Sequence, residues 1–201
     1  FCVRVLREDI NKIQYPKGFI IMDVEDQKSI LREVFNELGL NQKVFTFKQV
    51  LRFISVEKSK LDYLSYILEN KKHDNDRELH RVFFKYLEKQ QRNYALDFDD
   101  LLNYTLYIFS KNQDVLEKWQ KRLHYIQVDE TQDSSQKQFM LIEMLASFHK
   151  NLFVVGDPDQ TIYEWRGAKP EILVDFDKQF PTAQTILMNQ NYRSTPNILN
   201  L

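Results

Sequence analysis

Two adjacent carboxylates follow a short apolar run in the second half of the chain. Asp129 and Glu130 come directly after residues 125–128, which have the character of a buried strand, and packing explains such a pair poorly. One carboxylate could bind Mg²⁺, which takes one or two protein carboxylates and keeps most of its waters. The other could orient or deprotonate a water molecule, a contribution of about 10²–10⁴ in rate. We therefore assign Asp129 to a metal ion and Glu130 to an attacking water.

The same acidic segment has a purely structural alternative, in which it caps the next helix. Asp133 and Gln136 resemble a capping box. For Asp133 this explanation is as good as a chemical one. For Asp129 and Glu130 we prefer the chemical interpretation, because both carboxylates are expected where a buried strand reaches solvent.

A second apolar run is followed by a polar turn. Residues 152–155 resemble another buried strand, and residues 156–160 follow it with the sequence Gly-Asp-Pro-Asp-Gln. The side-chain amide of Gln160 could sense the terminal phosphate of a nucleotide. Together with the acidic pair, this turn predicts two edges of one nucleotide-dependent active site.

Aromatic and cationic side chains follow this turn. Tyr163 and Trp165 lie two positions apart, and Arg166 comes next. Aromatic rings beside a cation can stack on unpaired bases, which contributes about 1–3 kcal/mol per base. Taken alone, the two rings are explained equally well as ordinary core aromatics.

A third polar cluster lies near the end of the chain, where Tyr192 precedes Arg193. A cation after a strand can contact a γ-phosphate as an arginine finger does, an effect of about 10³–10⁵ in rate. Tyr192 could stack on an adenine. Either residue taken singly is an unremarkable surface side chain.

The elements that must position these turns form an α/β pattern. Strands are expected at residues 123–128 and 152–155, with a helix between them. This order predicts a parallel pair joined by a right-handed crossover. Ligands of such sheets bind at the carboxyl ends of the strands, which is where the acidic pair and the second turn fall. A third strand is expected at residues 185–188.

The first 94 residues have a helical pattern throughout. Residues 26–38 place apolar side chains on one face, and Gly39 is suited to end that helix. Thr46 is suited to cap the next helix. This helical pattern ends near residue 95, and Asp97 or Asp99 is expected to cap a further helix.

Composition excludes several classes of protein. Of the 201 residues 43% are hydrophobic, which is ample for a core, and the net charge of -1 gives no general attraction to nucleic acid. A single cysteine, Cys2, allows no internal disulfide and favours a reducing, cytoplasmic setting. No apolar stretch approaches the roughly 20 residues of a membrane helix. Because the chain begins without Met inside a helical pattern, we expect it to be part of a longer polypeptide.

Five blocks together resemble the UvrD/Rep-type superfamily 1 DNA helicases. The acidic block resembles that family's Walker B segment, and the two later blocks resemble its third and fourth motifs. A block near residue 95 matches a further family signature, and the first two residues resemble the tail of an upstream one. The blocks are residues 128–133, 156–168, 190–194, 95–102 and 1–2.

The resemblance implies a role for each candidate residue. Mg²⁺ would be held by Asp129, water would be activated by Glu130, and the γ-phosphate of ATP would be coupled to DNA by Gln160. The resemblance further implies that Arg193 contacts the same phosphate and that Tyr192 stacks on adenine. The single-stranded DNA path would be lined by Tyr163, Trp165 and Arg166.

Three features depart from the family pattern. Thr131 stands where an aromatic residue is usual, and Asn189 where Glu is usual, which leaves local packing and fine tuning open. The phosphate-binding sequence G-x-x-x-x-G-K-[ST] does not occur in these 201 residues. We therefore expect this chain to hold only part of an ATP site and, alone, to hydrolyse no ATP.

The resemblance also implies an incomplete RecA-like parallel-sheet core of the P-loop NTPase type, preceded by an all-helical subdomain. We expect an inserted helical subdomain at 1–94, with the tail of an upstream motif at 1–10. The C-terminal part of the first RecA-like motor domain is expected at 95–183, and the start of the second at 184–201. Such a helicase would use ATP to move 3′ to 5′ on single-stranded DNA and unwind duplex DNA. DNA-repair or replication accessory proteins are possible partners.

Two alternatives remain open. The first is the motor of a RecB/AddA-type helicase–nuclease, which a downstream nuclease domain would identify. The second is a non-catalytic DNA-binding module that keeps the fold. A Walker A lysine upstream of Phe1 would favour a motor, and its absence would favour the module.

Overall fold

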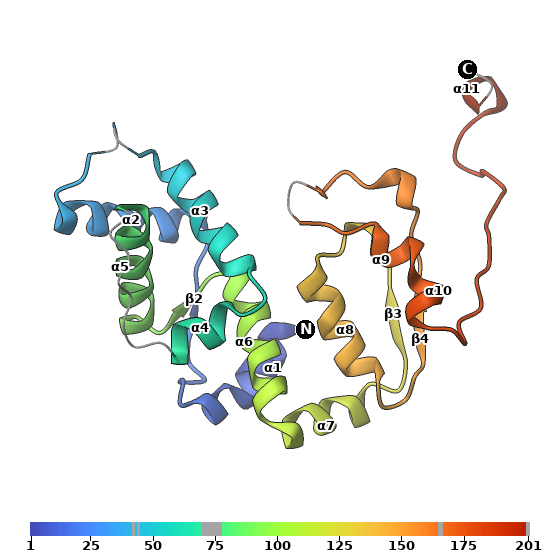
Figure 1. The fold of residues 1–201 in the computed structure, drawn as a ribbon, viewed down its shortest axis with the longest axis horizontal. Coiled ribbons are helices and arrows are strands. Elements are labelled where there is room, and N and C mark those ends of the chain that lie inside the picture. Colours follow the sequence, from blue (N-terminus) through green and yellow to red (C-terminus); the bar gives the residue numbers. More distant parts are fainter. Residues whose placement is uncertain (42, 44, 70–77, 165–166, 200–201) are drawn as a thin grey trace.

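The computed structural model describes residues 1–41, 43, 45–69, 78–164 and 167–199. Figure 1 shows a mostly helical N-terminal half and a C-terminal half that contains β3 and β4, and α6 and α7 lie between them. The first half contains α1 (Cys2–Asp9), the 3-10 helix η1 (Ile10–Ile13), β1 (Ile20–Ile21), α2 (Val24–Leu38), α3 (Phe47–Ser59), α4 (Tyr63–Glu69), α5 (Glu78–Arg92) and β2 (Ala95–Leu96). The second half contains α6 (Phe98–Lys111), α7 (Gln113–Arg122), β3 (Ile126–Val128), the 3-10 helix η2 (Thr131–Asp133), α8 (Gln136–Ala146), β4 (Leu152–Val154), the 3-10 helix η3 (Pro158–Gln160), α9 (Glu171–Val174), α10 (Phe176–Gln179) and α11 (Pro196–Leu199).

Side-chain caps begin two of the long helices, α3 and α6, where the sequence predicts them. Thr46 caps α3, and its side chain forms a capping box with Gln49. Asp97, rather than Asp99, caps α6. Gly39 ends α2 with a φ of 65°, a left-handed conformation that costs glycine little. These local predictions are confirmed.

The expectation of an entirely helical first half is wrong at one place. β1 pairs in parallel with β2, with Ile20 opposite Ala95, and the Met22 amide donates to the Leu96 carbonyl at 2.9 Å. A strand of two residues is too short to show the alternating pattern by which strands are found in a sequence. The pair joins the segment before α2 to the segment before α6.

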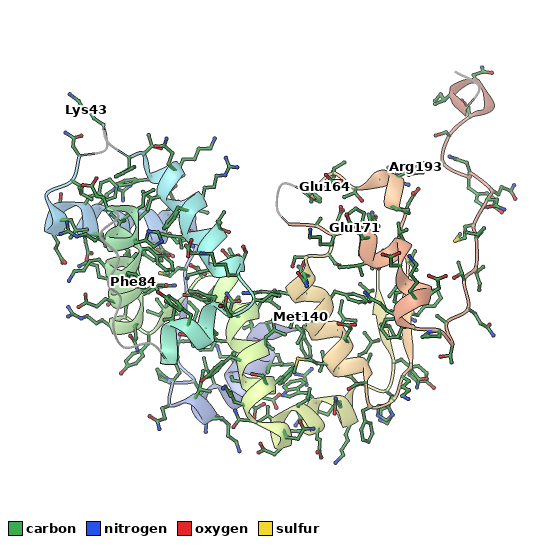
Figure 2. All side chains as sticks on the ribbon, in the orientation of Figure 1. Lys43, Phe84, Met140, Glu164, Glu171 and Arg193 are labelled. Atoms are coloured by element: carbon green, nitrogen blue, oxygen red, sulfur yellow. The ribbon has the colours of Figure 1, made fainter. Side chains whose placement is uncertain are left out.

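The described residues bury two hydrophobic clusters. One lies among α2, α3 and α5, and includes Leu31, Val50 and Tyr86. The other gathers α1, α6, α7 and α8, and includes Leu6 and Trp119. Figure 2 shows the side chains of both halves, with Phe84 on α5 and Met140 on α8. The helix α1 therefore packs with α6 of the second half, although it comes first in the chain.

The predicted parallel pair is present as β3 and β4. Ile126 lies opposite Leu152 and Val128 opposite Val154, and α8 connects the two strands. Both strands are shorter than expected. The fold class is thus mixed helix and short parallel strands, which fits a partial α/β core.

The expected third strand at residues 185–188 is not formed. These residues have no assigned secondary structure, and Leu187 is 77% exposed. A strand needs a neighbour for its backbone hydrogen bonds. Figure 1 shows this stretch as part of an extended segment that runs from α10 to α11 along the outside of the molecule. In the described residues, no helix combines the length and apolar character needed to cross a membrane.

Candidate functional site

The turns that follow β3 and β4 are hydrogen-bonded to each other. The Val155 amide donates to the Val128 carbonyl at 2.8 Å, which extends the strand pairing by one residue. The Thr131 amide then donates to the Val155 carbonyl at 3.0 Å, and the Thr131 hydroxyl donates to the same oxygen at 3.0 Å. The structure therefore brings the acidic turn and the glutamine turn together at the carboxyl ends of the two strands, as the sequence predicts.

Asp129 and Glu130 are both exposed at this end. One oxygen of Asp129 (Oδ1) accepts the Glu130 amide at 2.9 Å, and within the described residues its other oxygen receives no hydrogen bond. Mg²⁺ needs only one or two protein carboxylates, since waters and phosphates complete its shell. A single free carboxylate oxygen fits that donor set. No group of three or more potential metal ligands occurs in the part of the chain that the structure describes.

Glu130 has a left-handed backbone, with a φ of 50° and a ψ of 43°. Among the described non-glycine residues only Gln14, Tyr94 and Lys150 share a positive φ, and all three follow helices, whereas Glu130 precedes η2. A left-handed backbone conformation costs a non-glycine residue about 1–3 kcal/mol, and it persists only where the surrounding structure holds it in place. Such conformations gather at functional sites, so this one adds weight to Glu130 as a chemical residue.

The residues that follow Glu130 are buried and hold its turn. Thr131 is fully buried, and its hydroxyl donates to the Val155 carbonyl. This hydrogen bond explains how a small polar residue is accommodated at a position where the helicase family usually has an aromatic residue. Gln132 is 1% exposed, and its Nε2 donates to Glu130 Oε2 at 2.8 Å. Its Oε1 accepts the Asp157 amide at 3.1 Å. The sequence did not identify Gln132 as a site residue, because a glutamine in a polar segment is expected to be exposed, and nothing near it in the sequence indicates that it is buried.

The glutamine turn is organised by Asp157. Its Oδ1 accepts the Asp159 amide at 3.0 Å and so caps η3, and its Oδ2 accepts Gln160 Nε2 at 2.7 Å. Gln160 is exposed, and its amide lies on the turn that contacts the acidic segment. Glycine suits position 156, because a Cβ atom there would lie closer to Gln132 Oε1 than real Cβ atoms approach, so the Gln132 side chain would have to shift.

The capping explanation for Asp133 is wrong. Ser135 caps α8, and it forms the capping box with Gln138. Asp133 lies in η2 instead, and its Oδ1 is buried without a hydrogen-bond partner among the described residues. Two serines follow Asp133, and the second of them, Ser135, can cap the helix as well. The sequence pattern alone did not distinguish a cap at Asp133 with Gln136 from a cap at Ser135 with Gln138.

Tyr163 lies beyond the glutamine turn and is 38% exposed. The chain after it returns to the start of α8, where Ala168 forms an antiparallel bridge with Ser135 and the Lys169 amide donates to the Ser134 carbonyl at 3.0 Å. Trp165 and Arg166, which the sequence assigns to DNA, lie outside the described residues.

Tyr192 and Arg193 are not brought to the acidic turn. Tyr192 is 81% exposed and donates to Gln190 at 2.9 Å, and the Arg193 amide donates to Asn191 at 2.9 Å, so these bonds stay within the segment. Figure 2 shows Arg193 on the extended C-terminal segment. Local sequence spacing could not reveal where this segment would lie.

A second acidic cluster is buried between the two halves, and sequence reasoning did not identify it. Lys58 is fully buried at the end of α3, and its Nζ donates to Asp97 at 2.6 Å, to Asp100 at 2.7 Å and to Gln90 at 3.1 Å. Tyr86 donates to Asp97 at 3.3 Å. This cluster joins α3, α5 and the start of α6, so part of the block at residues 95–102 serves the core.

Charge and burial compete in this cluster. Burial disfavours the charged form of Asp97, but the charge and hydrogen bond of Lys58 outweigh it, and the pKa of Asp97 is lowered. Burial and the neighbouring Asp97 charge prevail at Asp100 and raise its pKa to about 7. Burial also opposes the charge of Lys58, yet the two carboxylates outweigh it and raise the pKa of Lys58.

A second lysine extends the cluster to α8. Lys137 Nζ donates to the Lys58 carbonyl at 2.7 Å and to the Asn103 side chain. Asn103 in turn donates to the Lys58 carbonyl at 3.0 Å. Burial lowers the pKa of Lys137 to about 8. The helix that follows the acidic turn is thereby tied to the end of α3.

Comparison with known proteins agrees with this arrangement. The model of the UvrD/REP helicase N-terminal domain matches residues 1–181. The protein named ATP-dependent DNA helicase PcrA from Staphylococcus aureus (strain Mu50) is 40% identical over 199 residues, which cover 99% of this chain and 27% of that protein. The protein of the same name from Bacillus subtilis (strain 168) is 40% identical over 198 residues, or 98% of this chain and 27% of the relative.

The chain therefore spans about a quarter of the length of these curated relatives, 27% in each. The resemblance seen in the sequence blocks holds across nearly all of its residues. Because the helicase model covers residues 1–181, both the helical half and the paired turns fall within one family description. The chain belongs to the UvrD/REP helicase family.

Proposed function

We propose that the chain forms part of the motor of an ATP-dependent DNA helicase, and that the paired turns are its part of the ATP site. One observation carries the proposal: the turns after β3 and β4 are hydrogen-bonded through Thr131 and Val155. That contact gathers Asp129, Glu130 and Gln160 at one end of the strand pair. The relatives named ATP-dependent DNA helicase support the choice of ATP and DNA over other substrates.

The three side chains have separate roles in this proposal. Asp129 would hold Mg²⁺, and the bound ion would neutralise charge on the phosphates. Glu130, exposed beside it, would take the proton of the attacking water. Gln160 would leave Asp157 and bind the γ-phosphate, so that the turn reports whether ATP is present.

DNA would bind next to the same turn. Tyr163, Trp165 and Arg166 follow Gln160 within six residues, and aromatic rings with a cation suit unpaired bases. A change at the γ-phosphate would then alter the grip on single-stranded DNA through a short stretch of backbone. Duplex DNA would be unwound as the motor moves, 3′ to 5′ as the family resemblance implies.

Tyr192 and Arg193 would complete the site from another segment. We assign Tyr192 to the adenine and Arg193 to the γ-phosphate. Both need the C-terminal segment to lie closer to β3 than it does in this structure. In this proposal residues 184–201 begin a second motor domain, residues 95–183 belong to the first, and residues 1–94 form the inserted helical subdomain.

The setting of the protein follows from the same proposal. A motor that acts on DNA would work in the cytoplasm, together with accessory proteins of DNA repair or replication. A helicase–nuclease of the RecB/AddA type remains an alternative within the class, and a non-catalytic DNA-binding module one outside it.

The test uses the full-length protein that contains these residues. ATP hydrolysis is measured with and without single-stranded DNA, and unwinding is measured on duplexes with a 3′ or a 5′ tail. We expect DNA-stimulated hydrolysis, loss of hydrolysis in Glu130→Gln, and unwinding from the 3′ tail. DNA binding without hydrolysis would identify the non-catalytic module, and nucleolytic cleavage would identify the helicase–nuclease.

Two further measurements separate the parts of the proposal. Trp165→Ala is expected to weaken DNA-stimulated hydrolysis far more than basal hydrolysis, whereas equal loss of both would make Trp165 a core residue. The 201-residue chain alone is expected to hydrolyse no ATP. Turnover by this chain that Glu130→Gln abolishes would contradict that expectation.

A further inference from the structure

A buried amide connects the two turns of the candidate site. Gln132 is 1% exposed, and both ends of its side chain are used. Its Nε2 donates to the carboxylate of Glu130 at 2.8 Å, and its Oε1 accepts the backbone amide of Asp157 at 3.1 Å. Asp157 in turn accepts the side-chain amide of Gln160 at 2.7 Å. A continuous chain of hydrogen bonds thus runs from Glu130 to Gln160.

The surroundings leave this side chain little freedom. Gly156 lies directly against Gln132 Oε1, and a Cβ atom there would force the Gln132 side chain to shift. Thr131, the residue before Gln132, donates both its amide and its hydroxyl to the Val155 carbonyl. The left-handed backbone of Glu130 turns its own carboxylate back toward the Gln132 amide. Gln132 is therefore held between two backbone segments, and a shift of either one reaches it.

Glutamine is suited to make both bonds at this length. A carboxylate partner requires a donor, and a backbone amide requires an acceptor, so the two ends must differ. Glutamine offers both in a single planar group. Glutamate keeps the acceptor and loses the donor, and methionine has a similar length with neither strong group. Burial makes the loss of either partner costly, because water cannot replace it.

We propose that Gln132 is a positioning residue that sets the orientation of the Glu130 carboxylate and makes it depend on the turn that carries Gln160. The inference rests on the proposed function, in which Glu130 activates water. Oε2 of Glu130 is occupied by Gln132, which leaves Oε1 to face the water. When Gln160 leaves Asp157 for a phosphate, the Asp157 amide shifts, and the shift passes through Gln132 to the carboxylate.

The test is a double-mutant cycle in the full-length protein, read by single-turnover hydrolysis of ATP on single-stranded DNA. Gln132→Met alone is expected to lower the rate about 10–100-fold, a part of what a general base contributes. The KM for ATP and the affinity for single-stranded DNA should stay within about twofold of the parent, because Gln132 touches neither ligand in the proposed site. In a Glu130→Gln background, Gln132→Met should cost less than about twofold, because the group it positions is already lost.

Gln138→Met is the matched control. Gln138 lies six residues further on and accepts the Ser135 amide at 2.8 Å in the cap of α8, so it is a bonded amide with no link to Glu130. It should leave hydrolysis within about twofold of the parent. Gln132→Glu provides a second route if Gln132→Met does not fold, since it keeps the acceptor for Asp157. Gln132→Glu should also slow hydrolysis in the parent protein. In the Glu130→Gln background it should change the rate of hydrolysis by less than about twofold, as Gln132→Met does.

The outcomes separate the two proposals. A parent protein that hydrolyses no ATP in the presence of DNA would overturn the proposed function itself. A parent that hydrolyses ATP, combined with Gln132 substitutions that reduce the rate by the same factor in both backgrounds, would overturn the positioning role alone. An unchanged rate in both Gln132 variants would do the same.

Discussion

Two acidic clusters of this protein look alike in the sequence and differ in their surroundings. Asp97 and Asp100 are buried around the Lys58 ammonium, and every described contact of that ammonium is to a neighbouring side chain of the core. Asp129 and Glu130 are exposed, and among the described residues their side chains form hydrogen bonds with near neighbours in the sequence. The charges of the first cluster join helices, whereas in the second one oxygen of each carboxylate receives no hydrogen bond from the described residues and can meet a ligand.

Burial separates the structural acids of this protein from the ones that can do chemistry. A buried carboxylate needs a partner of opposite charge, and the partner here comes from α3, nearly forty residues earlier than Asp97. An exposed carboxylate at the end of a strand needs none. Sequence patterns show the acids in both clusters but not which of them meets a lysine.

The largest expected effect is on catalysis at the exposed cluster. Glu130→Gln in the full-length protein should lower the rate of ATP hydrolysis by about 10²–10⁴, because it removes the proposed base. The free energy of unfolding of the 201-residue chain should change by less than about 0.5 kcal/mol, because the side chain is exposed. Hydrolysis rates and urea unfolding are the measurements, and a large loss of stability would erase the contrast between the clusters.

Lys58→Met tests the buried cluster in the opposite sense. Removing one partner of a buried ion pair leaves uncompensated charge, so the free energy of unfolding should fall by about 3–5 kcal/mol. Lys60→Met is the control, because the Lys60–Glu57 pair has the same separation of 2.6 Å as Lys58–Asp97, but the side chain of Lys60 is exposed whereas that of Lys58 is fully buried. That control should cost no more than about 1 kcal/mol. Equal losses in urea unfolding would mean that burial does not distinguish the two pairs.

Gly156→Ala sharpens the comparison at the junction of the two turns. The added methyl group meets Gln132 and the Thr131 backbone, so overpacking should lower the free energy of unfolding by about 1–3 kcal/mol. Gly18→Ala is the matched control, since nothing lies within 4 Å of its added Cβ and its φ is not positive. It should be neutral or stabilise by up to about 1 kcal/mol. Thermal unfolding of both variants gives the answer, and a harmless Gly156→Ala would show that the junction is loose.

The smallest expected effect is a pH dependence of stability at Lys137. Its pKa is about 8 in the folded chain against an ordinary value of 10.5, so the unfolded chain binds more protons between those two pH values. The free energy of unfolding contributed by this group should therefore rise with pH across that window. Lys137→Met should make the slope shallower, as measured by urea unfolding at several pH values. An unchanged slope would show that burial does not lower the pKa of Lys137 in the folded protein.

Several features of the fold could be read from the sequence because they depend on neighbours along the chain. The caps at Thr46 and Asp97 and the stop at Gly39 need only the residues within one turn. The parallel order of the two longer strands follows from strand–helix–strand connectivity. Where two local signals competed, as at Asp133 and Ser135, the local pattern was not enough.

The two-residue strand β1 could not be predicted, since its pairing with β2 spans more than seventy residues. The burial of Gln132 could not be predicted for a similar reason. Its partners are Glu130, close by, and Asp157, which only the parallel pairing of β3 and β4 brings near. Residues 185–188 carry a strand-like pattern, yet the described residues offer them no strand to pair with.

The residue types that could do chemistry, the family they resemble and the order of the elements around them could all be recognised in the amino-acid sequence. The tertiary structure alone decided that one acidic pair is neutralised by Lys58 while the other stays exposed, and that a buried glutamine connects the two turns. The physical reason is range: capping and periodicity act over a few residues, whereas burial and charge pairing depend on segments that meet only after the chain has folded.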